Sequence, residues 1–223
     1  MKYQIRKDLN KVIILLVVIS SVVSCSMDEN FSCDKDANQW VKSNLTEIRK
    51  MSSSDFFEID DLVYMKAAYN AFTPSQRQTI WIDKLENVLK LEWTEKESQF
   101  IESIFEFVKL NSFIFSEDRD EISFNKAEKE FYKWSVYAFE ELKWDKKLLY
   151  SIVGTPQELK ENKEIKSNLK SQTKLKTRGE TIDCECSVTS DWCFGYTAEC
   201  KKVDCIKSLG CGTLFLYTCD GEC

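Results

Sequence analysis

Eight cysteines lie within the last forty residues of this 223-residue chain, and cysteine thiols either bind a metal ion or pair as disulfides. Structural zinc sites usually carry their ligands in Cys-x₂-Cys pairs, and this segment contains no such pair. The spacing therefore favours disulfides over a metal site, while the roughly one hundred possible pairings of eight cysteines stay open. The cysteines concerned are Cys184, Cys186, Cys193, Cys200, Cys205, Cys211, Cys219 and Cys223.

A segment of this size cannot bury enough apolar surface to define one structure by itself. Disulfides contribute roughly 2–4 kcal/mol each, so four of them would replace much of the missing core. Residues 214–219 favour a strand and are followed by a turn at Asp220-Gly221. We therefore expect residues 184–223 to form a small, disulfide-stapled, β-containing module.

The N-terminus predicts that these cysteines fold outside the cytoplasm. Residues 1–24 combine a basic start with an apolar run that is short for a membrane span, as in a signal peptide. Val22-Val23-Ser24-Cys25 resembles the lipobox of bacterial lipoproteins, in which Cys25 would be lipidated. An ordinary secretory signal or a membrane anchor is the alternative. Export places the tail in an oxidising compartment, which favours disulfides.

Residues 25–33 would then form a lipidated acidic tether, because Asp28 and Glu29 follow closely after Cys25. This tether is similar to the surface-display signal of Bacteroidetes lipoproteins. We therefore predict an outer-membrane lipoprotein, exposed at the cell surface, whose membrane contact is its lipid anchor. Cys33 is then the odd cysteine, either free or paired with Cys25 if lipidation fails.

Residues 34–159 have the pattern of a helical domain with five or six helices, and no glycine precedes Gly154. Thr73-Pro74-Ser75-Gln76 and Thr94-Glu95-Lys96-Glu97 have the form of capping boxes, and Thr155-Pro156-Gln157-Glu158 predicts a further helix start. The expected fold is mainly α, a helical bundle followed by a polar linker and the Cys-rich module. Apolar residues at helical spacing are Trp40, Leu45, Ile48, Leu62, Met65, Tyr69, Phe72, Ile80 or Trp81, Leu85, Val88, Leu89, Phe100, Ile101, Ile104, Phe105, Val108, Phe124, Ala127, Phe131, Trp134, Ala138 and Leu142.

The composition argues against an enzyme and against nucleic-acid binding. The chain has no histidine, which is the commonest general base near neutral pH and the commonest zinc ligand. Its net charge is −6, and removing residues 1–24, which carry +3, leaves −9. An acidic protein is a poor candidate for binding nucleic acid or an anionic membrane surface. We expect no catalytic residues, no metal site and no cofactor.

Two groups of residues in the helical region have an alternative functional interpretation. The acidic pairs Asp60-Asp61, Glu117-Asp118 and Asp120-Glu121 could bind a metal or cleave a glycoside, but a solvated face of the helices or their connections is the favoured interpretation. The tryptophans could line a groove for a partner or a sugar, but their helical spacing favours a place in the core. These tryptophans are Trp40, Trp81, Trp93, Trp134 and Trp144.

Residues 160–183 are polar and rich in lysine, which indicates a linker whose second half is a flexible connector. Lys174, Lys176 and Arg178 offer basic cleavage sites just before the first tail cysteine. A plain tether that is never cut is the favoured interpretation.

The tail, with Cys184-x-Cys186, Ser187-Val-Thr-Ser-Asp191-Trp192-Cys193 and Gly210-Cys211-Gly212-Thr213, resembles the fulvocin C-related bacteriocin family. In the helical region, Phe72-Thr-Pro74 and Trp81-Ile-Asp-Lys-Leu85 are similar to the helical part of the Bacteroidetes lipoproteins of that family. The spacing around Cys205 and at the C-terminus departs from the pattern.

This resemblance implies a bacteriocin-like module that acts on the envelope of related cells. The tail from Cys184 onward carries a net charge of −3, so it lacks the positive charge of many membrane-active peptides. Action through a receptor fits better, with candidate contact residues Trp192, Phe194, Tyr196, Phe215 and Tyr217, although these rings could instead pack on the disulfides. The alternative function is a non-toxic cell-surface interaction or adhesion protein whose stapled tail binds a partner.

Overall fold

Helices occupy most of the chain between Lys35 and Gly154, as the apolar spacing predicts. The computed structural model describes residues 30–32, 34–166, 184, 186–190, 200–204 and 207–222, with residues 208 and 209 described by their backbone only. Residues from Phe31 onward form one compact unit. The α-helices of the described part are α2 (Lys35–Ser43), α3 (Leu45–Ile48), α4 (Ser53–Phe57), α5 (Leu62–Ala71), α6 (Pro74–Leu89), α7 (Glu95–Leu110), α8 (Glu121–Val136) and α9 (Lys146–Leu149). They are joined by the 3-10 helix η1 (Ser112–Phe115) and the π-helices η2 (Tyr137–Glu141) and η3 (Tyr150–Gly154).

Side-chain caps set the starts of the two longest neighbouring helices. At α6, Thr73 accepts from the Gln76 amide while the Gln76 side chain accepts from the Thr73 amide, and Pro74 occupies the first helical position. Thr94 and Glu97 make the same reciprocal pair at α7. Each box satisfies two amides that the helix itself leaves without partners. Both capping boxes predicted from the sequence are confirmed.

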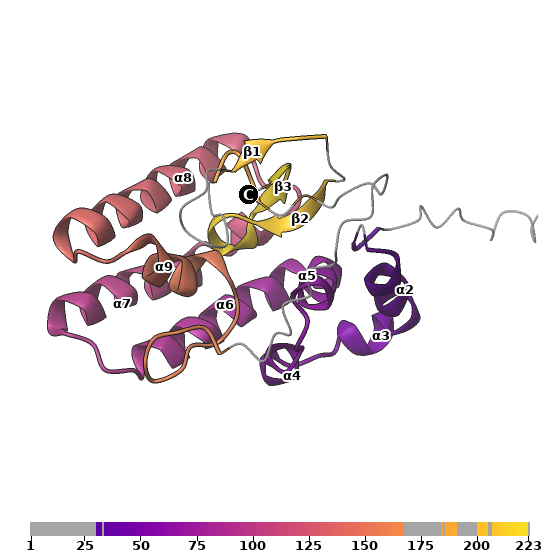
Figure 1. Ribbon diagram of the computed structural model, residues 1–223, viewed down its shortest axis with the longest axis horizontal. Coiled ribbons are helices and arrows are strands. Elements are labelled where there is room, and N and C mark those ends of the chain that lie inside the picture. The colour runs from indigo at the N-terminus through magenta and orange to yellow at the C-terminus, as the bar shows by residue number, and fades with distance from the viewer. Residues whose placement is uncertain are drawn as a thin grey trace, which may run out of the picture. The chain divides into compact units, whose positions relative to one another are not determined.

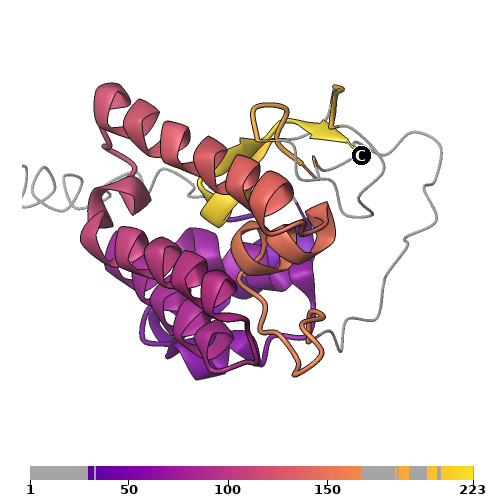
Figure 2. The ribbon, with the colours of Figure 1, turned by 90° about the vertical axis from the view of Figure 1, so that its left-hand side faces the viewer.

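The helix faces predicted from apolar spacing form the core. α6 buries Ile80, Trp81, Leu85 and Val88, and α7 packs along it. Figure 1 shows these two helices side by side, and both Figure 1 and Figure 2 show α8 next to the tail strands, where Phe124 meets Tyr217. No helix in the described ranges is long and apolar enough to cross a bilayer.

The tryptophans of the helical region belong to the core. Trp81, Trp134 and Trp144 are buried, and Trp40 and Trp93 are partly buried against the same cluster. The packing interpretation is therefore confirmed for these rings. Trp144 packs edge-to-face on Phe100, and Trp134 packs edge-to-face on Phe107, the geometry that aromatic quadrupoles favour.

The helix predicted to start at Thr155 is wrong. Residues 155–158 belong to no helix, and Thr155 has an extended backbone with φ −145° and ψ 141°. The Thr155 hydroxyl accepts from the Gln157 amide two residues on, at 3.4 Å, instead of capping a helix at the third. The Thr155 carbonyl accepts a hydrogen bond from the side chain of Lys84, which ties this segment to α6 in a non-helical conformation.

The described part of the Cys-rich tail contains two small antiparallel ladders. β1 (Lys201–Lys202) pairs with β4 (Gly221–Glu222), and β2 (Ser208–Cys211) pairs with β3 (Tyr217–Cys219). The predicted β-containing module is therefore confirmed. Its strand is shorter than predicted, because residues 213–215 form the 3-10 helix η4 (Thr213–Phe215).

Candidate functional site

Residues 213–216 of the tail insert into the core of the helical region, and we call them the docking turn. Leu214 is 0 % exposed, and Phe215 and Leu216 are 5 % and 4 % exposed. All three belong to the same apolar cluster as the faces of α5, α6 and α7. The tail is therefore packed on the helices through side chains that are as buried as the core itself.

The helical region meets this turn with Lys66, Tyr69, Trp81 and Arg119. Phe124 packs on the neighbouring Tyr217, and we call these five residues of the helical region the docking surface. Lys66 and Tyr69 lie on α5, Trp81 lies on α6, and Phe124 lies on α8. Arg119 precedes α8 in the loop after η1. The docking surface thus gathers residues from three helices and one loop.

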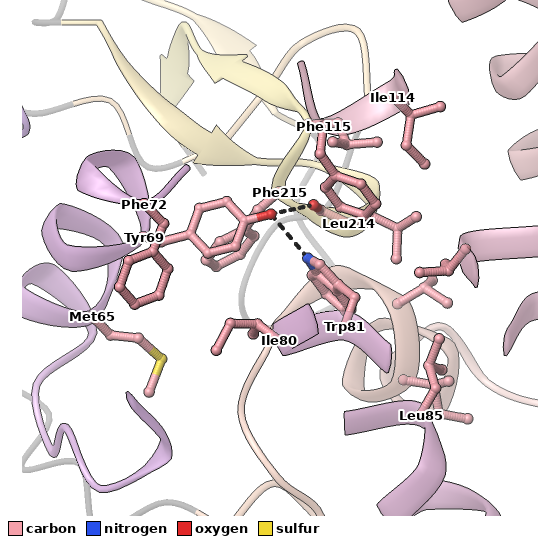
Figure 3. Packing of buried hydrophobic residues seen from close by; sticks show 14 of the residues in the cluster. Met65, Tyr69, Phe72, Ile80, Trp81, Leu85, Ile114, Phe115, Leu214 and Phe215 are labelled. Carbon is pink, nitrogen blue, oxygen red and sulfur yellow. Dashed lines mark hydrogen bonds between the residues drawn. The ribbon is translucent and has the colours of Figure 1, made fainter. Parts of the chain in front are cut away.

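The Tyr69 hydroxyl links the core to the docking turn. Trp81 Nε1 donates to this hydroxyl at 3.1 Å, and the hydroxyl donates to the Leu214 carbonyl at 3.3 Å (Figure 3). Desolvation by burial raises the pKa of Tyr69, so the phenol keeps its proton and remains a donor. Phe215 packs edge-to-face on both rings, with centroids 5.5 Å from Tyr69 and 6.2 Å from Trp81.

Two basic side chains, Lys66 and Arg119, complete the docking surface. Lys66 Nζ lies 5.8 Å from the centre of the Phe215 ring. Arg119 donates through Nη1 to the Ile114 carbonyl at 3.0 Å and through Nη2 to the Leu216 carbonyl at 2.7 Å. Its guanidinium also lies 3.9 Å from the centre of the Phe124 ring. Burial lowers the pKa of Arg119, but a guanidinium stays charged near neutral pH. Arg119 therefore bridges a carbonyl of the helical region and a carbonyl of the tail.

The docking turn has a backbone that side chains normally disfavour. Leu214 and Phe215 have φ of 56° and 54°, in the left-handed region, which costs roughly 1–2 kcal/mol per non-glycine residue. Gly212 has φ 70°, and a Cβ there would lie 2.5 Å from the Tyr217 ring and 2.7 Å from Ser190. Such a conformation persists only where the surroundings impose it. Here the surroundings are the core on one side and a disulfide on the other.

Cys211 and Cys219 form that disulfide and close the loop that carries the docking turn, with Cα atoms 5.2 Å apart. Lys66 Nζ lies 3.6 Å from Cys211 Sγ. A second disulfide joins Cys186 to Cys200, and Cys184 is also disulfide-bonded. Every cysteine in the part of the chain that the structure describes is thus oxidised. The prediction of a disulfide-rich tail is confirmed for these five residues.

The other predicted site residues have different positions. Phe215, predicted as a contact residue, lies in the core and is not accessible to a partner in this conformation. Tyr217 is half-buried against Phe124, with ring centroids 5.7 Å apart. The remaining predicted contact, lipidation and disulfide residues lie outside the described residues. These are Trp192, Phe194, Tyr196, Cys25, Cys33, Cys193, Cys205 and Cys223.

The acidic pairs of the helical region have structural roles at helix ends. Asp61 and Asp120 are the N-caps of α5 and α8. Glu117 accepts from Arg77 Nη2 at 3.1 Å. Within the described ranges there is no group of three or more His, Cys, Asp or Glu side chains that could hold a metal ion.

Sequence reasoning missed two buried basic side chains that organise the helices around the site. Arg77 donates to the carbonyls of Tyr69 and Asn70 at 3.2 and 2.9 Å, near the C-terminal end of α5, where cations are favourable. Lys84 is fully buried and donates to the carbonyls of Ser151 and Thr155. A lysine within an amphipathic helix carries no signal of burial, so only its hydrogen-bond partners reveal this role.

The chain matches no protein-family model, and comparison found neither a curated protein nor a solved structure to which it is similar. Function is therefore inferred from the chain itself. Its main features are the oxidised tail and the docking of that tail on the helical region.

Proposed function

We propose that this protein is an exported lipoprotein that displays a fulvocin C-like antibacterial module, with the module docked on a helical carrier. The observation that carries the proposal is the disulfide-closed docking turn, buried in the core of the helical region. A tail held in this way is presented to the surroundings as a fixed part of the protein. The resemblance of its cysteine pattern to the fulvocin C-related family supplies the class of activity.

The disulfides are compatible with an extracellular protein, because such bonds persist in oxidising compartments. The lipobox-like sequence before Cys25 supports anchoring by a lipid at the outer membrane. Fatty-acid labelling of the wild type and of Cys25→Ala tests this part separately. We expect label in the wild type only, and equal labelling of both would remove the lipid anchor from the proposal.

The target of the module is proposed to be a receptor or surface protein of a related cell. A net charge of −3 over the tail gives no attraction to anionic lipid. Because Phe215 is occupied by docking, the contact role falls to Trp192, Phe194 and Tyr196, which lie between Cys186 and Cys200 in the sequence.

The test is growth inhibition by the oxidised protein from Ser26 to Cys223, added over a wide concentration range to a panel of Bacteroidetes strains. We expect inhibition by the wild type and a loss of inhibition in the triple variant Trp192→Ala, Phe194→Ala, Tyr196→Ala. Tyr132→Ala, at a ring that is 71 % exposed on α8, is the matched control. No inhibition by protein of correct mass and helical circular dichroism would refute the antibacterial function.

A non-toxic surface interaction protein is the second candidate, and the docked tail favours it too, because a fixed tail is preorganised for binding. The same strains, incubated with fluorescently labelled protein, separate the two candidates. Saturable binding that the triple variant loses, without any effect on growth, would support the interaction protein. Binding together with inhibition would support the antibacterial module.

A further inference from the structure

The contacts between the docking turn and the docking surface need no covalent connection between tail and helices. We propose that the helical region is a specific receptor for the Cys-rich tail and keeps it bound after the linker, residues 160–183, is cut. This inference goes beyond the proposed function, since it holds whether or not the tail is antibacterial. It also assigns an interaction surface within the helical region to a partner of defined chemistry, a disulfide-closed Leu-Phe-Leu turn.

Cutting the linker leaves in place the described contacts between the docking turn and the docking surface. Lys174, Lys176 and Arg178 offer the basic cleavage sites, and they precede the docking turn by more than thirty residues. The buried rings and chains of Leu214, Phe215 and Leu216 stay within the turn. Cleavage changes only the effective concentration of tail at the docking surface, because an intramolecular contact becomes a bimolecular one.

The polar contacts make the receptor specific for the shape of the turn. Tyr69 and Arg119 both donate to backbone carbonyls, those of Leu214 and Leu216. Two carbonyls two residues apart face these donors because Leu214 and Phe215 are in the left-handed conformation. An extended Leu-Phe-Leu segment would not present its carbonyls in this way, so an unstructured chain with the same residues is not a good ligand.

The Cys211–Cys219 disulfide prepares the turn for binding. It closes a loop with a sequence separation of 8 residues, and the docking turn lies entirely within that loop. A loop held in its bound conformation loses less conformational freedom on binding, and the affinity rises accordingly. The Cys186–Cys200 disulfide lies outside this loop and serves as the matched control.

The experiment uses the protein from Ser26 to Cys223 with Cys33→Ser and a site for a sequence-specific protease inserted between Gln172 and Thr173. Without Cys33, no disulfide can join the two pieces. After cleavage of the oxidised protein, we expect both pieces to elute together in size-exclusion chromatography at low micromolar concentration. Denaturing electrophoresis without reductant should separate them. If the tail elutes alone although mass spectrometry finds its disulfides intact, the proposal is overturned.

Three variants identify the contacts responsible. Phe215→Ala should weaken the association of the cleaved pieces by about a hundredfold or more, as expected for a buried aromatic ring. Arg119→Gln leaves the apolar packing in place and should weaken it by about tenfold. Tyr132→Ala, on the exposed surface, should leave it unchanged. Unchanged association in both Phe215→Ala and Arg119→Gln would show that the docking turn is not the anchor.

The disulfides are compared in the same cleaved protein. Removing the loop disulfide with Cys211→Ser and Cys219→Ser should release the tail. Removing the other with Cys186→Ser and Cys200→Ser should leave the tail bound. Circular dichroism before cleavage confirms that the helices are folded in each case. Equal retention of the tail in both double variants would remove preorganisation by the loop disulfide from the proposal.

Discussion

Replacing Lys84 by methionine should change how the stability of the protein depends on pH. Lys84 is 0 % exposed and donates to the Ser151 carbonyl at 2.6 Å and to the Thr155 carbonyl. Lys84 Nζ also lies 5.2 Å from the centre of the Trp81 ring. Burial strips water from the charged form, which lowers the pKa of Lys84 well below its usual range.

The sign and size of the effect follow from proton linkage. An unfolded lysine titrates near about 10.4, so between the lowered folded-state pKa and that value the unfolded chain binds more protons than the folded one. The free energy of unfolding of the wild type therefore rises with pH by up to about 1.4 kcal/mol per pH unit in this window. Methionine also removes two hydrogen bonds to carbonyls, about 1 kcal/mol each, but that loss does not vary with pH.

Urea unfolding followed by far-ultraviolet circular dichroism measures the free energy at pH values from neutral to moderately alkaline. The free energy of unfolding of the wild type minus that of Lys84→Met should increase with pH, with a slope of up to about 1.4 kcal/mol per pH unit. Lys133→Met is the control, because the Lys133 side chain is 67 % exposed. Other titrating groups are common to both proteins and cancel in the difference. Parallel stability curves for wild type and Lys84→Met would refute the linkage argument.

Two further substitutions test local features of the fold. Tyr69→Phe keeps the ring but removes the hydroxyl that hydrogen-bonds to Trp81 and Leu214. In urea unfolding it should lower the free energy of unfolding by roughly 2–3 kcal/mol, whereas the control Tyr132→Phe should lower it by less than about 0.5 kcal/mol. Equal effects of the two changes would contradict the role of the Tyr69 hydroxyl. Thr94→Ala removes the cap of α7 and should cost about 1 kcal/mol in the same assay, so an unchanged midpoint would count against the capping box.

The capping boxes at Thr73 and Thr94 could be read from the sequence because all their partners lie within four residues. The failed helix start at Thr155 has the same pattern of residue types. It fails because Lys84, more than seventy residues earlier, takes the Thr155 carbonyl. A local signal predicts a helix correctly only where no distant side chain competes for the same backbone groups.

Residues 214–216 of the tail are a second case in which distant side chains override a local signal. Their apolar character predicts a strand, and the ladder does begin directly afterwards, at Tyr217. The docking turn forms instead because Tyr69 and Trp81 provide a buried place for Phe215, and Tyr69 lies 145 residues from Leu214. Phe215 therefore changes from a candidate surface contact into a core residue.

The helical class, the apolar faces and the capping boxes can be predicted from residue types and spacing alone, and so can the oxidised, cysteine-rich character of the tail. These features depend on residue type, on spacing along the chain and on hydrogen bonds between near neighbours. Two features are visible only in the tertiary structure. The tail docks into the helical core, and Lys84 and Arg119 donate hydrogen bonds to backbone carbonyls far away in the sequence. Those contacts join residues far apart in the chain, and their stability comes from burial that exists only once the chain has folded.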